Sequence, residues 1–281
     1  MGDHYIPQYY LKGFTGNGDL IWVYEKGCDR KFATVVKNIA QENNFYSPTL
    51  EQYLANEVEA PANEALSNIR KRKPLIAADK IALSKYMVTL LKRVPDSKRR
   101  LKQQAPGITH TIRANIDSKI MDVLAADPSK TESLERRRAE IYSVLDKYAK
   151  DPPKNVWLSC IPTHNANQRS LELMQKMTWL FLVYDAEPVF LASDNPVFFF
   201  PGVGIGSNQS EITFPITSNI VLWANWRSDL QEGYSRATMQ VIKEVNRRTA
   251  SKTTRYIYHA ADEKWIPGFI NKGNYKLHML L

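Results

Sequence analysis

The chain contains little cysteine and no long apolar run. Only Cys28 and Cys160 occur among its 281 residues, without the short spacing of a zinc site or a dithiol redox motif. A reducing compartment is the simplest explanation for so few cysteines. The most apolar stretches, near Trp179 and Phe199, are far shorter than the roughly 20 residues that span a bilayer, and no secretory leader is visible. We therefore expect a cytoplasmic protein with no membrane segment.

Several motifs that identify common enzymes are also absent. The sequence has no GxxxxGK[ST], HExxH, GxSxG or paired CxxC. The alternating glycines around Gly204 precede another predicted strand, whereas a dinucleotide site needs a helix there to supply its amide dipoles. The chain therefore lacks the spacings by which these enzyme classes are usually found.

Positive charge is abundant, and one segment holds nearly all of the excess. The formal net charge is +9, and residues 69–102 contain twelve Lys or Arg and two Asp, so the rest of the chain nets −1. Such a segment favours an anionic partner, RNA or DNA, although a solvated lysine-rich helix face has the same composition. The candidate contacts are Arg70, Lys71, Arg72, Lys73, Arg93, Lys98 and Arg99.

The pattern of apolar residues predicts β elements at both ends of the chain and helices between them. Residues 19–27 and 30–40 alternate like a β-hairpin, whereas the apolar period from Pro48 onward is helical. A last helix of this block is expected at 167–184, followed by short strands, one more helix and a final strand. We predict one α+β domain over 1–281. A mixed or antiparallel sheet of N- and C-terminal strands would pack against a helical insertion at about 48–180.

The N-terminal stretch carries two polar candidates on a stiff segment. His4 could ligate a metal or act as a general base, because imidazole titrates near neutral pH. Pro7 fixes its own φ and extends Ile6, so the stretch could present His4 and Gln8 rigidly. It could equally dock its tyrosines into a core.

Glu57 and Asp194 are the acidic candidates. The helical stripe through Leu50 and Leu54 places Glu57 where an apolar side chain is expected, and a buried carboxylate must be paired, protonated or metal-bound. A core face through Val58 would instead leave Glu57 at its edge. Asp194 and Asn195 interrupt an otherwise apolar strand. They form either an Asx-type turn or an acidic and amide pair at a strand end, where binding sites are often found.

These segments together resemble a known family. HYIPQYYLKGF, LEQYLANEVEA, LLKRVPDSKR, FLASDNPV and ITFPIT are similar, in this order, to the motifs of the domain of unknown function 4238 family. The resemblance covers nearly the whole chain and implies that the polar candidates belong to the family pattern. It implies no particular reaction. Members are mostly bacterial and are loosely associated with defence and mobile elements. The matching positions are His4, Pro7, Gln8, Tyr9, Leu11, Phe14, Glu57, Arg93, Pro95, Ser193, Asp194, Asn195 and Pro196.

Two functions remain open on this basis. In the first, the protein is a metal-dependent nuclease or phosphoesterase: His4, Glu57 and Asp194 would hold Mg²⁺ or Mn²⁺, and Gln8 and Asn195 would orient water or phosphate. In the second, the same polar residues form a structural network with Arg93, and the protein is a non-catalytic module that binds nucleic acid or protein. A hydrolase of small molecules is a third and weaker alternative.

Overall fold

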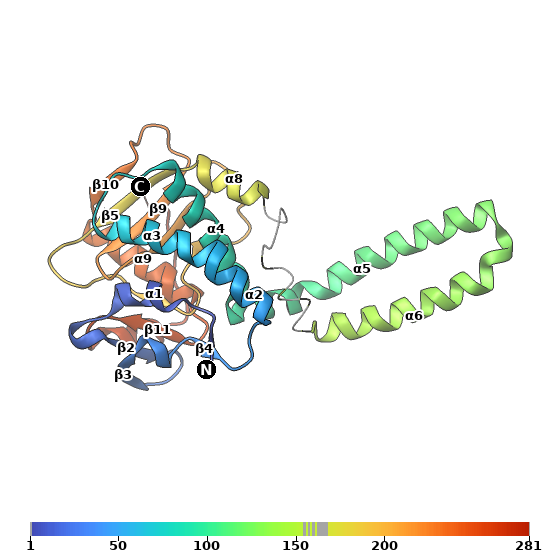
Figure 1. The fold of residues 1–281 in the computed structure, drawn as a ribbon, viewed down its shortest axis with the longest axis horizontal. Helices are drawn as coiled ribbons and strands as arrows, with labels where there is room; N and C mark the ends of the chain where they lie inside the picture. The colour runs from blue at the N-terminus through green and yellow to red at the C-terminus, as the bar shows by residue number, and fades with distance from the viewer. Residues whose placement is uncertain (1, 154–155, 157, 159–160, 162–167, 281) are drawn as a thin grey trace. The chain divides into compact units, whose positions relative to one another are not determined.

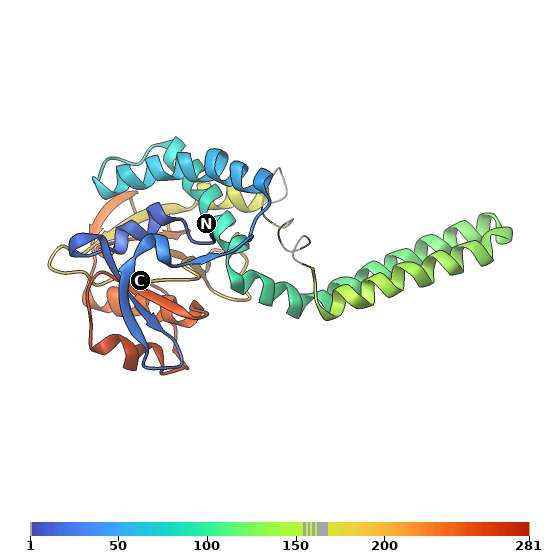
Figure 2. The ribbon, with the colours of Figure 1, turned by 60° about the horizontal axis from the view of Figure 1, so that its bottom comes forward.

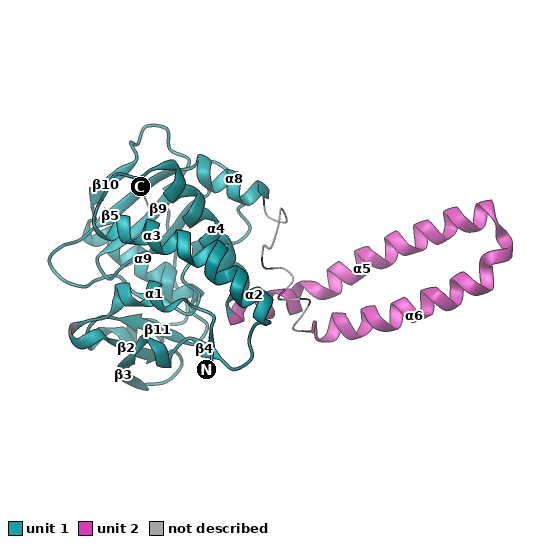
Figure 3. Cartoon of the chain, viewed as in Figure 1, with its two compact units in different colours: residues 1–94, 162–281 teal, residues 95–161 magenta. Residues whose placement is uncertain are grey.

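The computed structural model describes residues 2–153, 156, 158, 161 and 168–280. The chain divides into two compact units, residues 1–94 with 162–281 and residues 95–161, which we describe separately (Figure 3). The single domain expected over 1–281 stays a prediction. As expected, the chain is α+β, with helices concentrated between the N- and C-terminal strands.

Figure 1 labels many of the regular elements of the first unit. Its helices are α1 (Gln8–Leu11), α2 (Pro48–Tyr53), the π-helix η4 (Leu54–Glu59), α3 (Ala60–Arg70), α4 (Ala77–Arg93), α8 (Gln168–Lys176), α9 (Met239–Lys252) and α10 (Trp265–Ile270). Its strands are β1 (Asp3–His4), β2 (Leu20–Glu25), β3 (Lys31–Val35), β4 (Gln41–Glu42), β5 (Thr178–Val183), β6 (Ala192–Ser193), β7 (Phe198–Phe199), β8 (Ile212–Pro215), β9 (Ile220–Asn225), β10 (Gly233–Arg236) and β11 (Tyr256–His259).

The largest sheet has five strands in the order β10-β5-β9-β8-β7 and is buried on both faces. On one face, Leu180 and Val221 pack against Ile242 and Val245 of α9. On the other, the ring of Phe214 lies 6.2 Å from that of Tyr86 in α4. Apolar residues therefore line β5 and β9 without alternation, as expected for strands covered by helices on both sides.

A four-stranded antiparallel sheet, β3-β2-β11-β6, joins the two ends of the chain. The β2–β3 hairpin and the sheet of N- and C-terminal strands are thus confirmed. Tyr24, Ile257 and Ala250 of α9 share a core with Ile266 and Ile270 of α10. Helix α9 consequently contacts both large sheets.

The helix expected at 167–184 is only half correct. Helix α8 ends at Lys176, and Thr178–Val183 is the strand β5. A short apolar run has no periodicity that separates a buried strand from a buried helix, and pairing with β9 and β10 decides the conformation here.

The aromatic N-terminal stretch is docked into the first unit. Strand β1 pairs with β4, and the Tyr5 amide donates to the Ala40 carbonyl at 2.9 Å. Tyr10 is fully buried and stacks on Phe214, with 5.1 Å between ring centroids. This tertiary packing holds the stretch in place.

The second unit is a helical hairpin. Its two long helices, α5 (Pro95–Ala126) and α6 (Thr131–Lys150), run side by side in opposite directions and are joined at Asp127 and the 3-10 turn Pro128–Lys130 (Figure 2). Both helices fall in the predicted helical block. In the part of the chain that the structure describes, no helix is both long and apolar enough to cross a bilayer.

Candidate functional site

Arg93, at the end of α4, organises a buried polar cluster in the first unit. Its side chain is 3% exposed and forms an ion pair with Glu59 at 2.6 Å. The guanidinium also donates to the Tyr46 hydroxyl at 2.9 Å and to the His4 carbonyl. Three partners compensate for the removal of the Arg93 charge from water.

A cavity of about 400 Å³ borders this cluster. His4, Gln8 and Arg93, three of the candidate residues, therefore line one cavity. Its other residues come from the N-terminal stretch, from the loop before α2 at Tyr46, and from α2 and η4. The full lining is Gly2, Asp3, His4, Pro7, Gln8, Tyr9, Tyr46, Glu51, Leu54, Ala55, Glu59 and Arg93.

His4 contributes a neutral imidazole to the cavity wall. Burial lowers its pKa from the ordinary 6.5, and a hydrogen bond to the Lys37 backbone opposes that shift. Nε2 is buried and has no hydrogen-bond partner among the described residues. A neutral imidazole that donates through its other nitrogen leaves Nε2 as an acceptor, so His4 could bind a donor or accept a proton.

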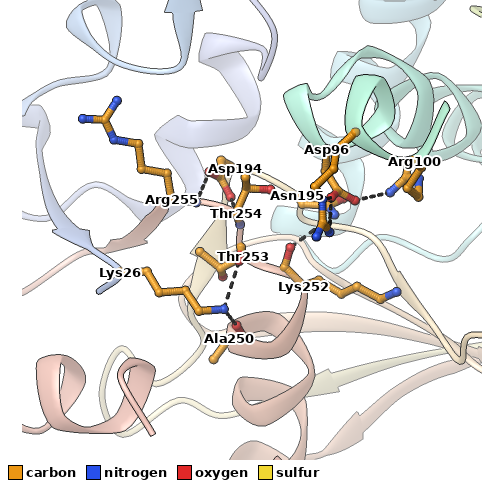
Figure 4. A network of polar contacts seen from close by, with 11 residues as sticks. Lys26, Asp96, Arg100, Asp194, Asn195, Ala250, Lys252, Thr253, Thr254 and Arg255 are labelled. Atoms are coloured by element: carbon orange, nitrogen blue, oxygen red, sulfur yellow. Dashed lines mark hydrogen bonds and ion pairs between the residues drawn. The ribbon is translucent and has the colours of Figure 1, made fainter. Parts of the chain in front are cut away.

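Asp194 lies apart from this cavity, in a loop beside the start of β11 (Figure 4). Its carboxylate accepts backbone hydrogen bonds from Thr254 at 2.8 Å, Arg255 at 2.6 Å and Tyr256 at 3.1 Å. Burial raises its pKa to about 6, although the three amides oppose the shift. Asp194 therefore joins two segments of the backbone that are distant in the sequence. It does not form the Asx-type turn, in which the side chain accepts from the amide two residues on, because Pro196 has no N–H.

Asn195 has a similar structural role. It is 2% exposed, its amide donates to the Lys252 carbonyl at 3.2 Å, and its backbone N–H donates to Ser193 Oγ at 3.1 Å. Asp194 and Asn195 form a bend between β6 and β7. The SDNP motif thus connects the end of α9 to the four-stranded sheet.

Of the two alternatives for Glu57, burial is wrong and the core face through Val58 is correct, since Val58 is 1% exposed. Glu57 is exposed, and Glu59, two residues later, forms the ion pair with Arg93. The cause is the π-helix at Leu54–Glu59, in which residues five apart lie on one face, so Glu59 follows Leu54. A 3.6-residue period extrapolated from Leu50 therefore selects the wrong carboxylate.

The predicted metal ligands do not converge. Among the described residues, which include His4, Glu57 and Asp194, no three His, Cys, Asp or Glu side chains are grouped to hold a metal ion. These residues do not fit the Mg²⁺ or Mn²⁺ site that we expected. We derive no step through a metal.

The basic segment does not form one continuous face. Arg70 donates to the carbonyls of Tyr9 and Tyr10 at 3.0 and 3.2 Å, and Arg93 is buried. Lys71, Arg72 and Lys73 are exposed in the first unit, where Arg72 pairs with Asp185. In the second unit Lys98 and Arg99 are exposed, and Arg99 pairs with Asp96 at 2.5 Å. Arg70 and Arg93 anchor the fold, and the remaining five are accessible.

Sequence reasoning missed Glu59 and Tyr46 in the cluster. A π-turn has no signature in residue spacing, so only the structure identifies Glu59. It also missed a second buried ion pair, in which Arg248 of α9 contacts Glu211 at 2.6 Å. Arg248 is four residues after Glu244 on α9, and that spacing could have indicated a pair.

A comparison with protein families gives the identity that these features support. The model of the family described as protein of unknown function (DUF4238) matches residues 3–263. The chain belongs to this family, as its motifs indicated. Neither the curated proteins nor the solved structures include a significant match.

Proposed function

We propose that this chain is a non-catalytic binding module whose polar motif residues stabilise the fold. One observation carries the proposal: Arg93 and Asp194 are occupied by protein groups, Arg93 by Glu59, Tyr46 and His4, and Asp194 by three backbone amides. A side chain so occupied has little capacity left for a substrate.

Nucleic acid is the partner that we propose for this module. The exposed Lys71, Arg72 and Lys73, with Lys98 and Arg99 of the hairpin, supply the positive charge. RNA or DNA bound in this way loses affinity as salt increases. The logarithm of the binding constant falls linearly with the logarithm of the salt concentration, with a slope of roughly 0.7 to 0.9 per phosphate contact. We place the module in the bacterial cytoplasm, in a defence context, on its composition and family resemblance.

Charge reversal tests the nucleic-acid proposal. Lys71→Glu with Lys73→Glu should weaken binding of mixed-sequence RNA and DNA and flatten the salt dependence. A matched variant, Lys264→Glu with Lys272→Glu, changes the same charge at exposed positions outside the basic segment. Equal effects of the two variants, or affinity that is independent of salt, would remove nucleic acid as the partner.

A hydrolase at the His4 cavity is the second candidate. The position of His4 favours it: the residue lines the cavity, its buried Nε2 has no hydrogen-bond partner among the described residues, and a neutral imidazole can act as a general base for a group that reaches it. Cleavage should be followed on RNA, DNA and small phosphoesters, with and without Mn²⁺. Activity that His4→Gln abolishes in a folded protein would replace the binding-module proposal with this one. Activity that the variant retains would exclude His4 as the base.

A further inference from the structure

The α5–α6 hairpin has very little core of its own. Its described helical residues include only four that are buried with no charge, Ser97, Ala105 and Thr109 on α5 and Leu145 on α6. Arg113 of α5 pairs with Asp146 of α6 at 2.6 Å, and Asp117 accepts from the Tyr142 hydroxyl at 2.6 Å. The apolar residues closer to the turn, among them Ile116, Ile120 and Ile141, are only half-buried. Two helices that bury so little apolar surface need further packing to be stable.

Four large apolar side chains of the hairpin are exposed and lie at the same level. Arg113 lies opposite Asp146, and the helices are antiparallel, so Ile108 and Ile112 are level with the stretch that carries Val144 and Tyr148. Their exposures are 44%, 38%, 47% and 37%. They can therefore form one continuous patch.

These four residues also share a face. Each directly precedes a residue of the contact between the helices: Thr109 and Arg113 on α5, Leu145 and Ala149 on α6. Consecutive residues of a helix are rotated by about 100° around its axis. In two antiparallel helices, the residues that directly precede the contact positions therefore lie on the same side of the pair. We call Ile108, Ile112, Val144 and Tyr148 the apolar patch.

The opposite face of the hairpin is different. The residues that directly follow the same contact positions are His110, Ala114, Asp146 and Lys150, and all four are exposed. They carry three ionisable groups and no large apolar side chain. One face of the hairpin is thus apolar where the other is hydrated, which is the pattern of helices in a larger bundle.

We propose that the apolar patch is covered by the same patch of a second copy of this chain, so that two hairpins form a four-helix bundle. The available area suits this occupant. The 20 residues of α6 span about 30 Å, and two helices are about 20 Å wide, which gives about 600 Å² per partner. That is the low end of stable interfaces, so the dimer should form at micromolar concentration.

Charge sets the relative direction of the two hairpins. Lys119 and Arg137 occupy the same face closer to the turn, because each precedes a half-buried contact residue. Arg137 also pairs with Glu140 at 3.7 Å, which offsets part of its charge. If both turns lay at one end of the bundle, these cations would face one another across the interface. An antiparallel arrangement, with the turn of one copy at the base of the other, avoids that repulsion.

Sedimentation equilibrium of the full-length chain, from about 1 to 100 µM, tests the dimer. The wild type should be dimeric in the upper part of this range. Ile108→Lys with Ile112→Lys should raise the Kd at least about 100-fold, because four charges would be buried in the symmetric interface. His110→Lys with Ala114→Lys places the same residues on the opposite face of the same helix and should leave the Kd within about threefold of the wild type. Far-UV circular dichroism shows whether all three proteins keep their helices.

Cross-linking tests the direction in a Cys28→Ser, Cys160→Ser background. A short bis-maleimide should join two copies that carry Val144→Cys, near the centre of the patch, but not copies that carry Ser129→Cys at the turn. Efficient linkage at Ser129→Cys would overturn the antiparallel arrangement. A wild type that is monomeric at 100 µM would overturn the dimer itself, and so would equal dimerisation of the two lysine variants. These outcomes include the case in which another segment of the same chain covers the patch.

Discussion

Arg93 and Arg248 are two buried arginines in the same unit with different surroundings. The Arg248 side chain is fully buried, and its partners Glu211 and Glu244 are 3% and 5% exposed. The Arg93 side chain is 3% exposed, but its partner Glu59 is 25% exposed and lines a cavity. The two ion pairs therefore differ in how far water reaches the carboxylate: Glu59 is a quarter exposed, whereas Glu211 is almost fully buried, although Glu244 beside it lines another cavity of about 360 Å³.

The two sites also differ in what else they hold. Glu211 accepts the Leu280 amide at 3.0 Å, and Glu244 accepts the His278 amide at 2.8 Å, so this pair ties down the C-terminal tail. Phe198 and Phe200 lie against the Arg248 guanidinium, at 5.1 and 4.9 Å. Arg93 instead secures the N-terminal stretch through the His4 carbonyl. Each arginine fixes one end of the described chain.

The largest effect should come from Glu211→Ala. The change leaves Arg248 buried with Glu244 alone and frees the Leu280 amide, so the free energy of unfolding should fall by about 3 to 5 kcal/mol. Urea unfolding measures this. The exposed Glu57→Ala is the control and should change stability by less than about 0.5 kcal/mol. A loss below 1 kcal/mol for Glu211→Ala would show that the Arg248 site is not sealed.

Asp194 extends the comparison to a buried carboxylate held by backbone amides. Its folded pKa of about 6 is above the unfolded value near 3.9. The contribution of Asp194 to the free energy of unfolding is therefore complete below about pH 4, where the carboxyl is protonated, and is lost as pH rises to about 6. The expected loss is about 3 kcal/mol. Urea unfolding between pH 4 and 7 should show this loss in the wild type but not in Asp194→Asn. Identical pH profiles would contradict the raised pKa.

Glu59→Ala should cost less than Glu211→Ala. Water in the cavity can partly solvate Arg93 once its partner is removed, so we expect a loss of about 1 to 3 kcal/mol. The same unfolding experiment, with Glu57→Ala as the control, measures it. A loss as large as that of Glu211→Ala would mean that the two arginines are equally enclosed and that the comparison fails.

His4→Gln should have the smallest effect, about 1 kcal/mol or less, because it removes one hydrogen bond to the backbone at Lys37. The lowered pKa is measured separately by NMR titration of the five histidines, with the variant used to assign His4. The His4 imidazole should titrate below 6.5, so its contribution to stability is lost as pH falls below that value. A midpoint above 6.5 would place a charged imidazole at the cavity.

Much of the fold was accessible from the sequence because local patterns specify it. Alternation in 19–27 and 30–40 predicted the β2–β3 hairpin, and the 3.6-residue period predicted the helices of the central block. Residues 178–183 were mistaken for helix because a strand buried on both faces shows no alternation. The partner strands, and not the local pattern, determine that segment.

The candidate site was partly accessible. His4, Gln8 and Arg93 line one cavity, and the sequence had indicated each of them as a candidate, because a stiff N-terminal segment and a basic helix end were both visible. Asp194 was placed in the same site on topology alone, yet its carboxylate faces the amides of Thr254 and Arg255. A motif shows that a side chain is polar, but the direction of that side chain depends on the backbone around it.

The sequence by itself determined the family, the α+β class and the polar residues worth examining, because motifs and periodicity are local properties. Tertiary structure alone decided which carboxylate meets Arg93. The choice between Glu57 and Glu59 depends on a π-turn at Leu54–Glu59, and α3 and α4 pack beside this turn in the folded unit. Burial of Arg93 then requires the nearest carboxylate, since an unpaired charge away from water would cost several kcal/mol.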